Sequence, residues 1–251
     1  MKNQKGKVAI VTGGARDIGK AVSVKLAEEG VKVVINYFNN PDDAKETQDL
    51  IHSFGGESII VQGDMTKKAD VEKVVSEATK AFGSSIHYLV NVAGGLVARK
   101  TLSEMDENFV NLLMRLNFNS TFLVTQACVP FMPAGAAIVN FASQAARDGG
   151  GPGAAIYAAS KAAVMTYTRG LAKELGPQGI RVNSLCPGMI NTTFHDEFTK
   201  DVVRQNVAAA TPLKREGRAS EVADLVAYLL SDEASFLTGN NVDINGGLAF
   251  S

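Results

Sequence analysis

KVAIVTGGARDIG, residues 7–19, passes from an apolar, β-branched run through a glycine-rich turn into a segment of helical period. The run is apolar throughout rather than alternating in polarity, which is typical of a strand buried on both faces. A glycine-rich turn between such a strand and a helix presents free backbone amides at the helix N-terminus, where the helix dipole favours a phosphate group. The stretch therefore predicts a strand, a turn and a helix that together bind a phosphate.

Similar apolar runs recur along the chain and alternate with segments of helical period. The runs expected to form strands are 7–12, 31–36, 58–62, 86–91, 136–141, 181–186 and 241–244. The segments expected to form helices include 18–29, 69–82, 106–131, 155–175 and 220–230. This alternation, with short connections, predicts the α/β class: a doubly wound, parallel, seven-stranded sheet with right-handed crossovers and helices on both faces. In such a sheet, ligands bind at the carboxyl ends of the strands.

Size and composition favour a single domain. With 251 residues, of which 45% are hydrophobic and 20% are charged, the chain can bury roughly three quarters of its unfolded surface around one core. No linker, internal repeat or low-complexity tract divides the sequence. We therefore expect one domain over residues 1–251.

Charge and targeting patterns exclude several classes of function. The formal net charge is −1 and the basic pairs 67–68 and 99–100 are interpreted as solvated surface, so no nucleic-acid partner is expected. The first apolar run is too short for a signal peptide or a membrane span, which predicts a cytoplasmic protein with no membrane partner. Cys128 and Cys186 lie far apart and share no ligand spacing with the histidines, so we expect neither a disulfide nor a metal site.

Five motifs follow predicted strands in a fixed order. They are Thr12-Gly13-x-x-x-Asp17-x-Gly19, Asn91-x-Ala93-Gly94, Ser143, Tyr157-x-x-x-Lys161 and Pro187-Gly188. Together they resemble the short-chain dehydrogenase/reductase family, in its compact single-domain branch, over essentially the whole chain. The resemblance implies a Rossmann-like fold, NAD(P)-dependent oxidoreductase chemistry on CH–OH and C=O groups, a small substrate lid around 190–212 and a homotetramer.

One residue of the glycine-rich turn departs from the family pattern. Asp17 stands where the family usually has a third glycine, and a carboxylate that points at phosphates would weaken their binding. In one interpretation Asp17 is a helix N-cap that accepts from amides two or three residues on and is partly neutralised by Arg16. In the other, the site is degenerate and no longer binds a nucleotide. The motifs that remain intact favour the first interpretation.

The residues expected to bind the dinucleotide follow the strands. Gly13 allows a tight turn and Gly19 allows the helix to pack closely on the strand. The second predicted strand ends at Asn36 with no acid before Asp42, and Arg16 is suited to a 2′-phosphate, so NADP(H) is favoured and NAD(H) remains possible. The resemblance implies further cofactor contacts from Asp17, Ile18, Asp64, Met65, Asn91, Ala93, Gly94, Tyr157, Lys161, Pro187, Gly188, Ile190 and Thr192. Asn91 is equally consistent with a residue that only forms a turn.

Tyr157 and Lys161 lie on one face of a predicted helix, one turn apart. An ammonium within about 4–6 Å lowers the pKa of a phenol from about 10 by roughly 1–3 units, which suits a general acid. The resemblance implies that Tyr157 gives a proton to the carbonyl oxygen and that Lys161 also holds the nicotinamide ribose. It further implies that Ser143 stabilises the developing alkoxide and that Asn117 holds a water that relays protons to Lys161.

The substrate is expected to be a small carbonyl compound. Loops 144–153 and 190–196 resemble reductases of sugar-derived keto acids, such as 4-deoxy-L-erythro-5-hexoseulose uronate from alginate. In that case Arg147 and His195 meet the substrate, although Arg147 is equally suited to a local pair with Asp148, and His195 to the surface. The lid contains few aromatic residues. Three alternatives stay open: a 3-oxoacyl-thioester reductase, a glucose-type sugar dehydrogenase, and a non-catalytic nucleotide-sensing protein, which the presence of Tyr157, Lys161 and Ser143 disfavours.

Overall fold

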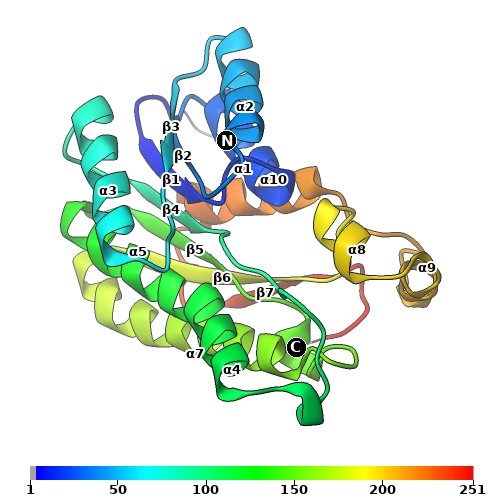
Figure 1. The fold of residues 1–251 in the computed structure, drawn as a ribbon. Helices are drawn as coiled ribbons and strands as arrows, with labels where there is room; N and C mark the ends of the chain where they lie inside the picture. Colours follow the sequence, from blue (N-terminus) through cyan, green and yellow to red (C-terminus); the bar gives the residue numbers. More distant parts are fainter. Residues whose placement is uncertain (1–3, 251) are drawn as a thin grey trace.

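Parallel strands form one sheet in the computed structural model, which describes residues 4–250 (Figure 1). The sheet has seven strands in the order β3-β2-β1-β4-β5-β6-β7, so the prediction of a doubly wound parallel sheet is confirmed. The strands are β1 (Val8–Thr12), β2 (Lys32–Tyr37), β3 (Ser58–Gln62), β4 (Tyr88–Asn91), β5 (Ala137–Phe141), β6 (Arg181–Pro187) and β7 (Asn241–Ile244). Each begins and ends within two residues of the run that the sequence predicts.

Helices cover both faces of the sheet, as Figure 1 shows. The first face carries α1 (Asp17–Glu28), α2 (Pro41–Ser53) and α10 (Ala219–Leu230). The second carries α3 (Lys68–Phe82), α4 (Glu107–Met114), α5 (Ser120–Cys128) and α7 (Ala155–Leu175). The short helix α6 (Ala145–Asp148) follows β5, while α8 (Thr193–Phe198) and α9 (Asp201–Ala210) extend beyond the sheet. None of the helices within residues 4–250 is long and apolar enough to cross a bilayer.

Two hydrophobic cores, one on each face, explain why the strands are apolar throughout. Along β1, Ala9 and Val11 belong to the core under α1 and α10, whereas Ile10 belongs to the core under α3, α5 and α7. Successive strand side chains point to opposite faces, so a strand covered on both sides has no polar face to show. The neighbouring strand repeats the arrangement, with Val33 on the first face and Val34 on the second.

The chain reverses its direction across the sheet between β1 and β4. From β1 the strand order proceeds outward to β2 and β3, and then returns to place β4 on the other side of β1. Thr12 pairs with Asn91 at the carboxyl ends of these two strands. The turns that follow them diverge to opposite faces, and this opens a crevice of the kind that binds ligands in doubly wound sheets.

The structure contains elements that the sequence analysis did not predict. Helix α2 begins with Pro41 after the N-cap Asn40, whose side chain accepts from the Asp43 amide, and this pairing of cap and proline is a sequence pattern that marks a helix start. The segment expected as one helix over 106–131 is interrupted by a π-helical turn, η2 (Arg115–Asn119). This turn contains Asn117, which is fully buried.

Candidate active site

A cleft of about 870 Å³ opens along the carboxyl ends of the strands. Turns after the first six strands and helix α8 form its walls. The volume lies in the range of about 300–1,000 Å³ that is usual for small-molecule and cofactor pockets. Among residues 4–250, no group of three or more His, Cys, Asp and Glu side chains is arranged to hold a metal ion.

The glycine-rich turn after β1 forms one end of the cleft. Gly13 has a φ of 61°, a conformation that favours glycine. A Cβ on Gly19 would lie 1.9 Å from the carbonyl oxygen of Gly13, so only glycine fits where α1 meets the strand. The first amides of α1 have no partner within the helix and are available to an anion. These features fit the pyrophosphate of a dinucleotide.

Asp17 does not cap α1, so that prediction is wrong. The N-cap is Arg16, without a side-chain cap, and Asp17 is the first helical residue with a φ of 51°. Its carboxylate instead accepts from Thr193 at the start of α8, with the amide at 3.0 Å and the hydroxyl at 2.5 Å. The Arg16 Nε lies 3.8 Å from Asp17 Oδ2. The carboxylate is thus held by donors on its own chain and ties the phosphate-binding turn to the α8–α9 segment (Thr193–Ala210).

Two asparagines predicted to bind the cofactor have structural partners instead. The Asn36 side chain accepts from the Gly13 amide at 3.2 Å and donates to the carbonyl of Gly63 at 3.1 Å, so it shapes the turn although it borders the cleft. The Asn91 side chain points between the sheet and the helices, where it donates to Asn140 Oδ1 at 2.9 Å. Asn91 does not line the cleft, so the structure favours the alternative in which this residue only shapes the turn. Its Oδ1 has no hydrogen-bond partner within residues 4–250.

All the predicted cofactor residues except Asn91 border the cleft, Asn36 among them. The set comprises Gly13, Arg16, Asp17, Ile18, Gly19, Asn36, Asp64, Met65, Ala93, Gly94, Tyr157, Lys161, Pro187, Gly188, Ile190 and Thr192. The Asp64 carboxylate accepts from the amide and the hydroxyl of Thr66, and these bonds hold the pKa of Asp64 below its usual value against the opposing effect of burial. The Arg16 side chain is 65% exposed, which leaves its guanidinium able to reach a bound ligand.

Ser143 and Tyr157 lie together at the other end of the cleft. Ser143 follows β5, and its hydroxyl accepts from the Ala145 amide at 3.1 Å. Tyr157 stands near the start of α7. Burial raises the pKa of the Tyr157 phenol, and hydrogen bonding to Ser143 opposes this rise. The Lys161 ammonium does not contribute to the pKa of this phenol, so the lowering expected from it is not seen.

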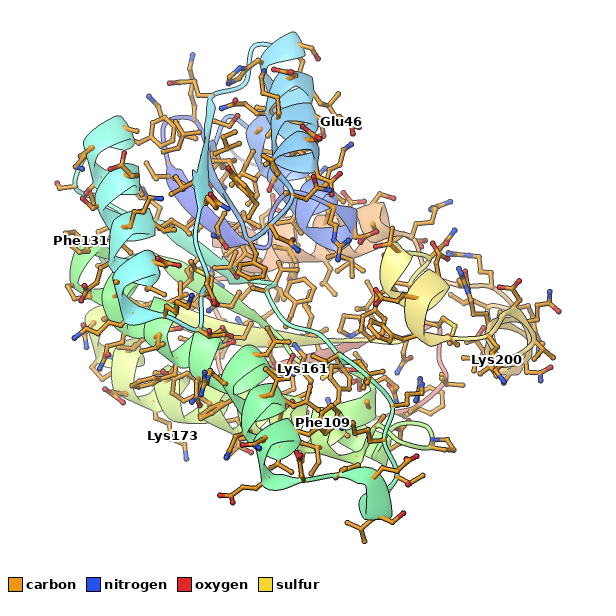
Figure 2. All side chains as sticks on the ribbon, in the orientation of Figure 1. Glu46, Phe109, Phe131, Lys161, Lys173 and Lys200 are labelled. Carbon is orange, nitrogen blue, oxygen red and sulfur yellow. The ribbon has the colours of Figure 1, made fainter. Side chains whose placement is uncertain are left out.

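Lys161 and Asn117 converge on the turn after β4. A Cβ placed on Gly94 would lie 2.6 Å from Asn117 Oδ1 and 3.1 Å from Lys161 Nζ, so this glycine gives both side chains room. Asn117 accepts from the Gly95 amide and donates to the Gly95 carbonyl, each at 2.9 Å. The Lys161 ammonium donates to the carbonyl of Phe141 at 2.7 Å, and burial lowers its pKa to about 8. In Figure 2 Lys161 lies near the centre of the view, whereas Lys173 of the same helix lies at the periphery.

The two predicted substrate residues have different surroundings. Arg147 points away from the cleft, with its Nε 3.1 Å from Asp243 Oδ1 and its Nη2 2.7 Å from the Asn241 carbonyl. Arg147 does not line the cleft and β7 holds the guanidinium, so the structure gives no support to its predicted contact with substrate. His195 does line the cleft, and its Nδ1 lies 3.0 Å from Thr199 Oγ1. Burial, reinforced by the Arg204 charge, lowers the pKa of His195 and favours the neutral imidazole.

Three residues have roles that the sequence analysis did not predict: Phe194 and Arg99 line the cleft, and Thr193 bonds to Asp17 beside it. Phe194 places its ring 6.2 Å from the Tyr157 ring and 5.2 Å from that of Phe198, so the segment over the cleft is more aromatic than expected. The spacing of these phenylalanines on one face of a short helix would have revealed the cluster. Thr193 and Arg99 carry no sequence pattern that marks them, because their partners are distant in the chain.

A doubly wound sheet whose cleft joins a phosphate-binding turn to a buried tyrosine and lysine is the architecture of nicotinamide-dependent oxidoreductases. Comparison with known proteins agrees, because residues 13–249 match the family described as Enoyl-(Acyl carrier protein) reductase. The chain belongs to the short-chain dehydrogenase/reductase family of NAD(P)-dependent oxidoreductases.

Individual relatives match over nearly their whole length. YgfF of Escherichia coli (strain K12), named an uncharacterized oxidoreductase, is 37% identical over 246 residues, which are 96% of this chain and 99% of the relative. The 3-oxoacyl-acyl-carrier-protein reductase of Staphylococcus epidermidis is 34% identical and covers 96% of this chain and 98% of its own. The crystal structure of a short chain dehydrogenase from Burkholderia cenocepacia J2315 in complex with NADP has a TM-score of 0.92 at 31% identity, covering 98% of this chain and 99% of that chain.

Proposed function

We propose that this protein uses NADPH to reduce the carbonyl group of a sugar-derived keto acid, such as the 4-deoxy-5-keto uronate released from alginate. The observation that carries the proposal is the shared cleft, which brings the hydroxyls of Ser143 and Tyr157 into the same pocket as the phosphate-binding turn. The complex of the Burkholderia cenocepacia relative with NADP supports the choice of cofactor.

The residues of the cleft suit an extended dinucleotide. The amides at the start of α1 would hold the pyrophosphate, with Gly13 and Gly19 leaving it room. At the end of β2 no acidic residue is available before Asp42, and the exposed Arg16 would meet a 2′-phosphate. Lys161, beside Gly94, would hold ribose hydroxyls.

When bound, the nicotinamide supplies a hydride to the carbonyl carbon. Tyr157 Oη then gives its proton to the carbonyl oxygen, and the Ser143 hydroxyl donates a hydrogen bond to the same oxygen as negative charge develops there. The raised pKa of Tyr157 keeps the phenol protonated and ready to act as an acid. Lys161, whose pKa is about 8, exchanges protons near neutral pH and is able to restore the proton to the phenolate.

The surroundings of Tyr157 favour a compact, hydroxylated substrate. The Phe194 ring lies beside the Tyr157 ring, and the α8–α9 segment acts as a lid over this end of the cleft. The neutral His195 has its Nδ1 engaged by Thr199, which leaves Nε2 for a substrate hydroxyl. A second candidate, the reduction of a 3-oxoacyl thioester, is supported by the similarity to the Staphylococcus epidermidis reductase, which is named for that reaction.

The proposal is tested by the loss of NADPH absorbance with a panel of carbonyl compounds: the alginate-derived keto uronate, other keto sugar acids and an acetoacetyl thioester. Glucose oxidation is tested separately, by the gain of NADPH absorbance when the protein is given glucose and NADP⁺. Turnover of the keto uronate in preference to the others is expected. Turnover of the thioester alone would replace the proposed substrate with the second candidate and leave the mechanism intact.

The variant Tyr157→Phe distinguishes an enzyme from a non-catalytic nucleotide sensor, because it removes the phenol hydroxyl and keeps the ring. We expect the variant to bind NADPH normally and to lose about 10²- to 10⁴-fold in kcat. Binding without any turnover by the unaltered protein would instead support a sensor.

The cofactor preference is tested by Arg16→Gln, which removes the charge and keeps a polar, though shorter, side chain. We expect the KM for NADPH to rise about tenfold while the KM for NADH changes little, since only the 2′-phosphate loses a partner. Equal effects on both cofactors would show that Arg16 does not select between them.

A further inference from the structure

Arg99, in the segment that follows β4, spans the substrate end of the cleft. Its Nε donates to the carbonyl of Phe198 at the end of α8, and its Nη1 donates to the carbonyl of Pro152, both at 3.1 Å. The packing beneath it is close, because a Cβ on Gly153 would lie 2.9 Å from the Arg99 Cβ. Two hydrogen bonds thus hold the guanidinium of this exposed side chain between the α8–α9 segment and the loop that leads to Tyr157.

The charge of Arg99 is not balanced by a carboxylate. Arg204, nearby, forms ion pairs with Glu216 and Asp196, and Arg147 forms one with Asp243. In the part of the chain that the structure describes, Arg99 takes part in no ion pair, and its two hydrogen bonds go to neutral carbonyls. Neither bond uses Nη2, so donors remain for a ligand.

The carboxylate of Asp148, which also lines the cleft, is already engaged. Its Oδ1 accepts from the Gly150 amide at 2.8 Å and its Oδ2 from Gln144 Nε2 at 3.3 Å. Arg99 is close enough to His195 to contribute to the lowered pKa of that imidazole, after burial and Arg204. A fixed cation with free donors thus shares one end of the cleft with a neutral imidazole.

We propose that Arg99 binds the carboxylate of the substrate and selects keto acids over neutral carbonyl compounds. This inference rests on the proposed function, because it assigns the acid group of that substrate to a particular residue. Ser143 and Tyr157 would hold the carbonyl oxygen at one point and Arg99 the carboxylate at another, so the substrate is oriented by both of its polar ends. Arg99 also tethers Phe198, which couples binding of the acid to the position of α8.

The test compares the keto uronate with its methyl ester, which has the same carbonyl without the charge. Arg99→Gln is expected to raise the KM for the acid about 10- to 100-fold, the usual effect of losing a charge-assisted contact, and to leave the KM for the ester within about twofold. Arg99→Lys keeps the charge but loses the planar fork, so its KM for the acid is expected to lie between those of the unaltered protein and Arg99→Gln. Lys100→Gln is the matched control, since it removes one positive charge at the next residue, where the ammonium lies over the Phe109 ring rather than in the cleft.

An equal rise in the KM of Arg99→Gln for the acid and for the ester would overturn the proposal and show that Arg99 only supports the loops. A second measurement does not depend on turnover: calorimetric titration of glucuronate, a carboxylate without the keto group, into the NADPH-loaded protein. Binding that is lost in Arg99→Gln and kept in Lys100→Gln supports the inference even if the keto uronate is not reduced, in which case only the proposed substrate fails. No binding of glucuronate by the unaltered protein, or equal binding by Arg99→Gln, would overturn it.

Discussion

Replacement of Asp17 by asparagine separates the two effects of a carboxylate beside a phosphate-binding turn. Asparagine also tolerates a φ near 51°, so the backbone conformation is kept while the charge is removed. The Thr193 amide and hydroxyl both donate to this carboxylate. The substitution thus weakens the tie to the α8–α9 segment and removes a negative charge near the predicted position of the pyrophosphate.

The two effects have opposite signs. Hydrogen bonds to a charged acceptor contribute about 1.5–3 kcal/mol and neutral ones about 1 kcal/mol, so exchanging the acceptor weakens the tie by about 1–2 kcal/mol. The Asp17 side chain is 23% exposed, and because solvent weakens such a bond we expect the loss of free energy to lie near the lower end of that range. If α8 closes over the substrate, the KM for the carbonyl compound rises about 5- to 10-fold. Removal of repulsion between charges several Å apart near a protein surface contributes about 1 kcal/mol, so NADPH binds about fivefold more tightly.

The assay combines fluorescence titration of NADPH with steady-state kinetics. Thr193→Val is the control, since it removes the hydroxyl donor and leaves the carboxylate in place. This control is expected to raise the KM for the carbonyl compound a few fold without tightening NADPH binding. Weaker NADPH binding by Asp17→Asn would refute the reasoning, because it would mean that the carboxylate supports the cofactor site. An unchanged KM would show that the contact with Thr193 does not hold α8 closed.

Two further predictions concern other parts of the cleft. Burial lowers the pKa of Lys161 from 10.5 to about 8, so between these pH values the unfolded chain binds a proton that the folded chain lacks, and the free energy of unfolding rises with pH across this window. Urea unfolding at several pH values should show this slope, and Lys161→Met should remove it; an unchanged slope would exclude Lys161 as its source. Gly19→Ala places a methyl group 1.9 Å from a backbone carbonyl oxygen and should abolish NADPH binding in a fluorescence titration, whereas Gly170→Ala, on α7 with no atom within 4 Å, should bind normally. Normal binding by Gly19→Ala would mean that the turn does not contact the cofactor.

Much of the fold could be read from the sequence because its determinants are local. A strand buried on both faces is apolar over consecutive residues, so the runs at 58–62 and 241–244 match β3 and β7 residue for residue. Glycine-rich turns, caps and helical spacing act over a few residues as well. The pairing of Tyr157 with Lys161 on one helix, and the position of Ser143 after a strand, therefore followed from spacing and order.

The sequence alone determined the order of the elements, the class of the sheet and the residues able to carry the chemistry. Only the tertiary structure decided how side chains were oriented and which partners they found. Asp17 meets Thr193, 176 residues away, and Arg147 turns to β7 while Arg99 enters the cleft. The physical reason is that a hydrogen bond or an ion pair depends on distances of a few Å between atoms, and the packing of distant segments sets those distances. Burial has the same origin, which is why the rise in the pKa of Tyr157 could not be foreseen from its neighbours in the chain.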